Sequence, residues 1–236
     1  MPTALLTGSS KGIGRATALA LISKKYRVIG ISRTSAGIDD DNFSELLMDL
    51  CDTKALERAV IEISRKYPID ILINNAGAGF YGLHSTLTPA MIHEMTTVNL
   101  EVPMLLCAVL LPQLIQRQGR IINISSITAK HSENTHGAAY GATKAGLSGF
   151  GSSLFAEVRK HGVGVINIHP DMTDTDLYRS ADFGADTSVE GCFLSPETVA
   201  AAVIGAAEAP KGVNICDITV SPQYRRIMRK KRSDND

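Results

Sequence analysis

The segment Thr7-Gly8-Ser9-Ser10-Lys11-Gly12-Ile13-Gly14 decides the fold of this chain. It follows a short apolar run, Ala4 to Leu6, and opens an amphipathic stretch from Gly12 to Lys25. Glycines at a strand-to-helix turn let the backbone approach a pyrophosphate at the helix N-terminus. Glycine is also the ordinary residue of tight turns, so the turn gains its meaning from its position between a strand and a helix.

Apolar, β-rich runs and amphipathic stretches alternate along the rest of the chain. The runs are apolar on both faces, which is typical of central parallel strands. They lie at 4–6, 28–31, 46–48, 69–73, 121–124 and 163–168, with a seventh at 214–220, and the helical stretches lie at 12–25, 53–66, 88–116, 138–161 and 196–208. This alternation predicts an α/β fold, a single doubly wound, Rossmann-like domain with a mainly parallel seven-stranded sheet and helices on both faces.

No linker divides the chain, so we expect a single domain over residues 1–224 and a basic C-terminal tail over 225–236. Residues 171–193 form a long, polar and weakly periodic segment, which favours a flexible flap over a site or a plain surface loop. The tail holds six bases, Arg225, Arg226, Arg229, Lys230, Lys231 and Arg232. Such a run is either solvated or in contact with an acidic partner.

Composition and charge exclude several classes of protein. With 24 Lys and Arg against 24 Asp and Glu, the chain shows no overall preference for nucleic acid. The longest apolar run, 102–111, is interrupted by Pro103 and is too short to span a bilayer, and no secretory signal opens the chain. Four widely spaced cysteines without an export signal indicate reduced thiols and a cytoplasmic location. The six histidines lack metal-ligand spacing, so we expect no metal site.

The spacing of the glycine turn, Thr-Gly-x-x-x-Gly-Ile-Gly, resembles that of the short-chain dehydrogenase/reductase family. A second motif of this family, Asn-Asn-Ala-Gly, stands at residues 74–77. The resemblance covers roughly Thr3 to Thr175 and implies a nicotinamide dinucleotide cofactor. It implies that Asn74 to Gly77 support the first strand and lie beside the adenosine side of the cofactor, and that Asp49 contacts the adenine. It assigns cofactor binding to Thr7, Gly8, Ser10, Lys11, Gly12, Ile13, Gly14, Ser32, Arg33, Asp49, Leu50, Asn75, Ala76, Gly77, Tyr140, Lys144, Pro170, Thr173 and Thr175.

Tyr140 is the one tyrosine with a lysine four residues later, Lys144. On a helix this offset places the phenol and the ammonium on the same face, about 5 to 6 Å apart at Cβ. A tyrosine pKa near 10 must fall by about three units to reach neutrality, and a fixed positive charge at Lys144 would supply that stabilisation of the phenolate. A tyrosine tuned in this way can pass a proton to a carbonyl oxygen while hydride reaches the carbon.

The resemblance completes a catalytic set of four residues: Asn99, Ser126, Tyr140 and Lys144. Ser126 matches the serine that hydrogen-bonds the substrate oxygen, although Ser125 stands beside it and the spacing to Tyr140 is 14 positions, one more than in many relatives. Asn99 matches the asparagine that kinks a helix and whose carbonyl holds a water on the lysine. Considered one at a time, these residues also have ordinary structural interpretations. Ser126 could be a turn residue at a strand end, Asn99 a helix-breaking polar residue, and Tyr140 with Lys144 an amphipathic pair.

Arg33 follows the second strand, where an enzyme using NAD normally carries an acidic residue. A guanidinium suits a 2′-phosphate, and Lys11 adds a second base from the glycine turn. With no acid between Gly30 and Ile38, the sequence predicts NADP(H) as cofactor.

The chain departs from the family pattern at two places. Asp171 replaces the glycine that usually follows Pro170, which puts a carboxylate near the nicotinamide loop. The last strand lacks the glycine-rich ending of tetrameric relatives. Small residues along the catalytic helix nevertheless allow close approach of a partner helix or packing within one subunit, and we expect a homodimer or homotetramer; they are Ala142, Ala145, Gly146, Gly149, Ser152, Ser153 and Ala156.

These patterns predict an NADP(H)-dependent oxidoreductase that interconverts a ketone and a secondary alcohol, with Tyr140 as proton donor or acceptor. The expected substrate is a small carbonyl or alcohol compound, and Phe80, Tyr81, residues 131–136 and the flap are expected to line its binding site. Acyl chains, hydroxy acids, sugars and steroids are all compatible with such a lining. The alternative is a non-catalytic sensor or scaffold that binds NADP(H) and docks partners through its tail. The intact set of four residues favours the enzyme.

Overall fold

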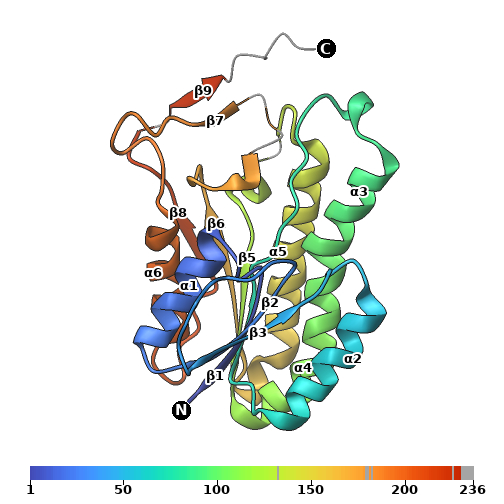
Figure 1. The fold of residues 1–236 in the computed structure, drawn as a ribbon, viewed down its shortest axis with the longest axis vertical. Coiled ribbons are helices and arrows are strands. Elements are labelled where there is room, and N and C mark those ends of the chain that lie inside the picture. Colours follow the sequence, from blue (N-terminus) through green and yellow to red (C-terminus); the bar gives the residue numbers. More distant parts are fainter. Residues whose placement is uncertain (132, 179–180, 182, 225, 230–236) are drawn as a thin grey trace.

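A computed structural model describes residues 1–236 except 132, 179–180, 182, 225 and 230–236. Seven parallel strands form one sheet in the order β3-β2-β1-β4-β5-β6-β8. Helices cover both faces, with α1 and α6 on one side and α2, α4 and α5 on the other (Figure 1). The expected doubly wound Rossmann-like fold is confirmed, and the strand order reverses between β1 and β4, where such sheets bind their ligands.

The strands of the sheet are β1 (Thr3–Thr7), β2 (Arg27–Ser32), β3 (Phe43–Leu47), β4 (Ile71–Asn74), β5 (Arg120–Ile124), β6 (Gly164–Pro170) and β8 (Asp217–Val220). The main helices are α1 (Gly12–Ser23), α2 (Thr53–Lys66), α3 (Pro89–Thr96), α4 (Val102–Arg117), α5 (Ala138–Val158) and α6 (Pro196–Ala207). Two apolar cores result, one on each face of the sheet.

Two strands differ from the sequence-based expectation. The run 46–48 is not a central strand, because β3 forms the edge of the sheet and its residues are exposed or half-buried. The last strand begins only at Asp217, three residues after the start expected from the apolar pattern, and it forms the opposite edge beside β6. Edge strands have one neighbour, so their apolar residues need not be fully buried.

The stretch expected as one helix over 88–116 contains a turn of π-helix at Thr97–Glu101, between α3 and α4. The combined segment Pro89–Arg117 is long and apolar enough to cross a membrane by length and composition alone. Four of its large apolar side chains, those of Met95, Leu106, Leu110 and Leu114, are fully buried in the protein, whereas Ile92 and Met104 are exposed. This pattern is that of a core helix.

The flap contains a short 3-10 helix, Asp176–Tyr178, and a strand, β7 (Phe183–Ala185). Strand β9 (Ile227–Arg229), from the segment expected as a tail, pairs antiparallel with β7. Arg226 also forms an ion pair of 3.2 Å with the buried carboxylate of Asp186. Arg225, Lys230, Lys231 and Arg232 lie outside the described residues, so the domain boundary at 224 stays a prediction.

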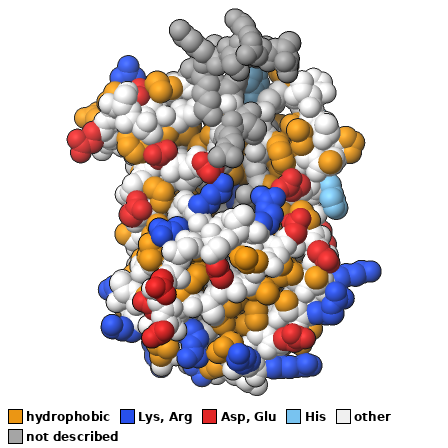
Figure 2. Space-filling view, in the orientation of Figure 1, with side chains coloured by type: hydrophobic (Ala, Val, Ile, Leu, Met, Phe, Trp, Pro, Cys, Tyr) orange, Lys and Arg blue, Asp and Glu red, His pale blue; other side chains and the backbone are white. Residues whose placement is uncertain are grey.

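Charged side chains of both signs are interspersed over the face that Figure 2 shows, in keeping with the neutral total charge. No single sign dominates this face.

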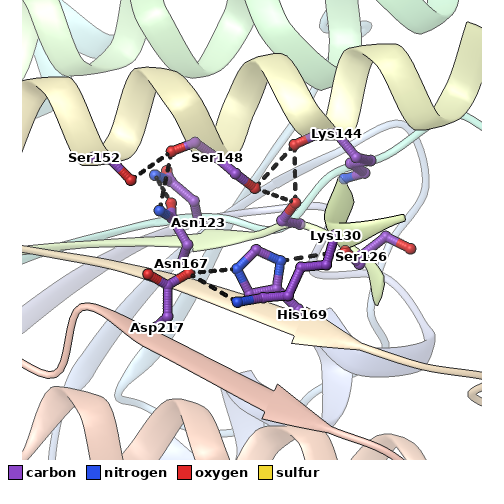
Figure 3. A network of polar contacts seen from close by, with 10 residues as sticks. Asn123, Ser126, Lys130, Lys144, Ser148, Ser152, Asn167, His169 and Asp217 are labelled. Carbon is purple, nitrogen blue, oxygen red and sulfur yellow. Dashed lines mark hydrogen bonds and ion pairs between the residues drawn. The ribbon is translucent and has the colours of Figure 1, made fainter. Parts of the chain in front are cut away.

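Helix α5 rests on a row of asparagine side chains that crosses the sheet (Figure 3). Asn74, Asn123 and Asn167 occupy the same register on β4, β5 and β6. Asn74 donates to Asn123 at 2.9 Å, Asn123 donates to Asn167 at 3.1 Å, and Asn167 donates to the Ser148 carbonyl of α5 at 3.1 Å. Gly151 faces this row so closely that a Cβ would overlap the Asn167 amide oxygen.

The close approach of α5 predicts that Gly151→Ala destabilises the protein. The added methyl must displace Asn167, and overpacking of this kind costs about 1 to 3 kcal/mol. Gly205→Ala in α6 is the matched control, since nothing lies within 4 Å of its Cβ position. That variant should gain about 0.5 to 1 kcal/mol from helix propensity. Urea denaturation measures both changes, and equal stability of the two variants would contradict this packing.

Candidate active site

A cleft of about 680 Å³ opens at the carboxyl ends of the parallel strands. It is lined by the glycine turn, the ends of β2, β3, β4, β5 and β6, the helix α5 and the loop after β6. All of the residues expected to bind the cofactor except Thr7 line this cleft, and so do Ser126, Tyr140 and Lys144. The fold therefore brings together residues that lie far apart in the sequence.

The glycine turn is held by the second motif. The Thr7 hydroxyl accepts from the backbone N–H groups of Asn75 and Ala76, each at 3.1 Å. In return the Asn75 amide donates to the carbonyls of Thr7 and Gly8 at 2.9 and 3.1 Å. A Cβ on Gly14 would overlap the Gly8 carbonyl, so the turn tolerates no side chain there. Asn75 thus supports the first strand. Thr7 holds the backbone of Asn75 and Ala76, which line the cleft, but does not line it itself.

The turn fits a dinucleotide. Gly8 and Gly12 have positive φ angles of 71° and 54°, which glycine adopts without strain. Lys11 is the N-cap residue of α1, and its side chain makes no hydrogen bond to the first turn of the helix. The residues of that turn, Gly12, Ile13 and Gly14, line the cleft. Free N–H groups at a helix N-terminus bind phosphate well.

Both bases expected at the adenosine ribose are paired with acids. Lys11 forms a 2.6 Å ion pair with Asp176, and Arg33 lies 3.4 Å from Glu94. Sequence reasoning missed these two carboxylates because they come from the flap and from α3, far along the chain. The site therefore does contain carboxylates, contrary to what the stretch from Gly30 to Ile38 indicated. Asp49 accepts from the Cys51 N–H at 3.0 Å, and Leu50 is buried beside it.

Tyr140 and Lys144 lie on the buried face of α5, each 3% exposed. The Lys144 ammonium lies 5.9 Å from the centre of the Tyr140 ring and donates to the Ile124 carbonyl at 2.8 Å. Burial raises the pKa of Tyr140 to about 12, although hydrogen bonds from Ser126 and Tyr81 act in the opposite direction. Burial also lowers the pKa of Lys144 to about 8. The expected fall of the phenol pKa is absent, because desolvation outweighs the hydrogen bonds from Ser126 and Tyr81.

The two serines after β5 have different surroundings. The Ser126 hydroxyl hydrogen-bonds the Tyr140 phenol and accepts from the Thr128 N–H at 3.2 Å. The Ser125 hydroxyl instead contacts the Lys144 carbonyl at 3.0 Å and the Ser148 hydroxyl at 2.8 Å. Ser126 therefore faces the cleft beside Tyr140, and Ser125 fastens α5 to the sheet.

Asn99 lies in the π-helical turn and is fully buried. Its side-chain oxygen accepts from the Ala78 N–H at 2.8 Å, and its amide donates to the Ala78 carbonyl at 2.8 Å and to the Thr143 hydroxyl at 3.0 Å. A turn of π-helix interrupts the regular backbone pattern and is frequent at functional sites. Asn99 thereby links the loop after β4 to α5.

Aromatic rings form a wall next to Tyr140. Tyr81 packs against the Tyr140, Tyr178 and Phe183 rings with centroid distances of 5.3, 5.6 and 5.3 Å. Burial raises the pKa of Tyr81 and of Tyr178, so both phenols stay neutral. Phe80 and the flap residue Tyr178 line the cleft as expected, and Tyr81 contacts Tyr140 without lining the cleft. The described residues of 131–136 do not line the cleft; instead Asn134 donates to the Thr128 and His131 carbonyls at 3.0 and 3.1 Å.

Asp171, in the loop after β6, is hydrogen-bonded to its neighbours. The Asp171 N–H donates to the Val220 carbonyl at 2.8 Å, and its carboxylate accepts from the Met172 N–H at 2.8 Å. Thr173 is buried and donates to the Asp171 carbonyl at 2.8 Å, and Thr175 lies beside Gly12. Among the described residues, no group of three or more His, Cys, Asp or Glu side chains is placed to hold a metal ion.

Comparison with known proteins agrees with this site. The model of the short chain dehydrogenase family matches residues 2–184. The chain belongs to the short-chain dehydrogenase/reductase family. This family member is 29% identical over 234 residues to serine 3-dehydrogenase of Agrobacterium fabrum, covering 93% of each chain. It is also 35% identical over 185 residues to the 3-oxoacyl-[acyl-carrier-protein] reductase FabG of Salmonella typhimurium, covering 75% of each chain.

Solved structures of other proteins share the architecture of this chain. A metagenomic short-chain oxidoreductase solved with NADP is 28% identical, with a TM-score of 0.78 and coverage of 94% of this chain and 98% of the other. A 4-hydroxyisoleucine dehydrogenase solved with NADH is 21% identical, with a TM-score of 0.80 and coverage of 94% and 98%. The second of these supports the fold alone.

Burial of Lys144 makes the stability of this dehydrogenase depend on pH. Below about pH 8 the lysine is charged in the folded and the unfolded chain, so the full cost of burying its charge is present. Between about pH 8 and 10.5 the unfolded chain holds the proton and the folded protein has lost it, so stability rises with pH in this window. We expect Lys144→Met to be more stable than the wild type near neutrality.

The advantage of Lys144→Met should shrink by up to about 3 kcal/mol across this window, since each pKa unit is worth about 1.4 kcal/mol. Urea denaturation of the two proteins at a series of pH values measures the difference, in which the contributions of all other groups cancel. A difference that stays constant from neutrality to pH 10.5 would show that the folded Lys144 keeps its ordinary pKa.

Proposed function

We propose that this oxidoreductase interconverts a ketone and a secondary alcohol with NADP(H), and that Tyr140 is its proton donor or acceptor. One observation carries the proposal: a buried phenol, hydrogen-bonded to a serine and close to a lysine, opens into a cleft that also contains a glycine-rich turn. We assign to Asn99, Ser126, Tyr140 and Lys144 the roles that the family resemblance implies for them. The cleft thus joins a dinucleotide subsite to a proton-transfer group.

The cofactor, held by the glycine turn and the residues after β2, β3 and β6, would supply the hydride for the carbonyl carbon. The protein supplies the proton and the orientation. The Ser126 and Tyr140 hydroxyl groups hydrogen-bond each other at the cleft, so a carbonyl oxygen that enters beside them could accept from both. The oxygen gains a proton from Tyr140 as negative charge develops on it. Lys144, fixed by the Ile124 carbonyl, stabilises the phenolate that remains.

The preference for NADP(H) rests on Lys11 and Arg33. Their side chains are 64% and 70% exposed, and their ion pairs lie at the surface. Exposed ion pairs contribute only about 0 to 1 kcal/mol, so a 2′-phosphate can replace Asp176 and Glu94 at little cost. A phosphate carries more charge than a carboxylate and accepts bidentate hydrogen bonds from a guanidinium.

We also propose a homodimer or homotetramer in a reducing compartment such as the cytoplasm. The small residues Ala142, Ala145, Gly149, Ser152 and Ala156 are exposed along α5, which supports close packing of a second copy. All four cysteines are free.

A panel of carbonyl compounds tests the activity against the sensor or scaffold alternative. The panel contains acyl thioesters, hydroxy acid precursors, sugars and cyclic ketones, and NADPH oxidation is followed by absorbance. The enzyme hypothesis predicts turnover of at least one class. Tight NADPH binding without turnover of any class would favour the non-catalytic alternative.

Tyr140→Phe should lower kcat by about 10² to 10⁴, the usual value of general acid catalysis, and leave the NADPH dissociation constant nearly unchanged. Tyr26→Phe is the matched control, because Tyr26 is a buried tyrosine in the core beside α1 and α6. It should retain full turnover. Undiminished kcat in a folded Tyr140→Phe protein would disprove the assignment of the proton donor.

Arg33→Asp should weaken NADPH binding by about 2 to 3 kcal/mol, since a charge-assisted pair is lost and repulsion is added, while NADH binding suffers less. Glu94→Gln removes the competing carboxylate and should tighten NADPH binding. Fluorescence titration gives the dissociation constants of both cofactors for each protein. Tighter binding of NADH than of NADPH by the wild type would overturn the proposed preference.

A further inference from the structure

His169 is a buried histidine that the reaction described above does not use. It lies in β6, next to Pro170 at the cleft, and is 1% exposed. Its Nδ1 atom lies 3.2 Å from the Ser126 carbonyl oxygen, and its Nε2 atom lies 2.6 Å from Asp217 Oδ1 (Figure 3). The ring therefore joins the backbone of Ser126 to a carboxylate on the edge strand β8.

Both partners of the ring are acceptors. A backbone carbonyl has no hydrogen to give, and an ionised carboxylate only accepts. The hydrogen bond to Ser126 therefore needs a hydrogen on Nδ1, and the bond to Asp217 needs one on Nε2. The Ser126 carbonyl also accepts from the Ala129 N–H at 3.0 Å, so two donors from different segments fix its direction.

Asp217 is held in turn by Lys130. The Lys130 ammonium lies 3.6 Å from the same carboxylate oxygen that contacts His169. Lys130 belongs to the short helix Ile127–Lys130, whose N-cap residue is Ser126 itself. The chain Ser126, His169, Asp217, Lys130 thus closes a ring of contacts around the turn that carries the serine.

We propose that His169, oriented by Asp217, is a positioning residue for Ser126. The donation from Nδ1 holds the Ser126 carbonyl in place, and this fixes the backbone from which the Ser126 hydroxyl reaches Tyr140. A catalytic group held in place by a buried hydrogen bond loses rate when that support is removed, because small displacements of a reacting group slow a reaction strongly. The inference rests on the proposed function, since its consequence is a rate.

Two substitutions at the same position separate this role from simple packing. In His169→Asn the side-chain amide can occupy the place of Nδ1 and donate to Ser126, but it cannot reach Asp217. In His169→Gln the longer side chain places its amide near Nε2 and Asp217, and the donor to Ser126 is lost. Both variants remove the imidazole and leave a buried amide of similar polarity.

The experiment measures kcat, the NADPH dissociation constant and the melting temperature of wild type and both variants. We expect His169→Gln to lose about 10- to 100-fold in kcat and His169→Asn to exceed it by about tenfold, with NADPH affinity unchanged in both. Equal kcat values for the two variants would overturn the proposal, whether they match the wild type or fall together with the melting temperature.

A second measurement needs no variant and no turnover. Nitrogen-detected NMR of the wild-type histidine rings reports which nitrogens of His169 carry hydrogens. The proposal requires a hydrogen on Nδ1, and a ring whose single hydrogen lies on Nε2 would overturn it. If the wild type oxidises NADPH with no compound of the panel, the proposed function fails on its own, and the ring measurement still decides whether His169 donates to Ser126.

Discussion

The close packing of helix α5 on strands β5 and β6 is the constraint on which the site depends. Asn167 of the asparagine row donates to the Ser148 carbonyl of the helix. Gly151 has no side chain that would keep the helix away from the row. Ser125 adds a third attachment at the Lys144 carbonyl. These contacts are between polar groups in the interior, where an unpaired partner is costly, so they fix the helix in one position. The fixed position of the helix also fixes the positions of Tyr140 and Lys144.

The close packing of α5 on the sheet also explains the direction of the pKa shifts of Tyr140 and Lys144. A helix pressed against the sheet buries both side chains, and burial favours their neutral forms: it raises the pKa of Tyr140 and lowers that of Lys144. The ammonium is compensated by one backbone carbonyl, Ile124. The phenol therefore holds its proton at neutral pH, as a proton donor to a carbonyl oxygen must. A group that adds charge or hydrogen bonds at the cleft would shift this balance.

Local patterns in the sequence predicted the parts of the site that depend on neighbours in the chain. The glycine turn follows from a strand and a helix that adjoin it, and Tyr140 and Lys144 share a face because they are four residues apart on one helix. The partners of Lys11, Arg33 and His169 could not be predicted in this way. Asp176, Glu94 and Asp217 come from segments that only the fold brings near, 165, 61 and 48 residues away. Strand β9 was missed because it has three residues inside a basic run and exists only by pairing with the flap.

The central claim is that hydride reaches a carbonyl carbon in this cleft while the protein gives a proton to the oxygen. Isotope transfer measures this directly, by incubating the protein with NADPH deuterated at the transferable position and the best carbonyl compound in ordinary water. We expect mass spectrometry to find one deuterium on the carbinol carbon of the product and ordinary hydrogen on its oxygen. An alcohol without deuterium at that carbon would contradict hydride transfer from the cofactor, and with it this account of the site.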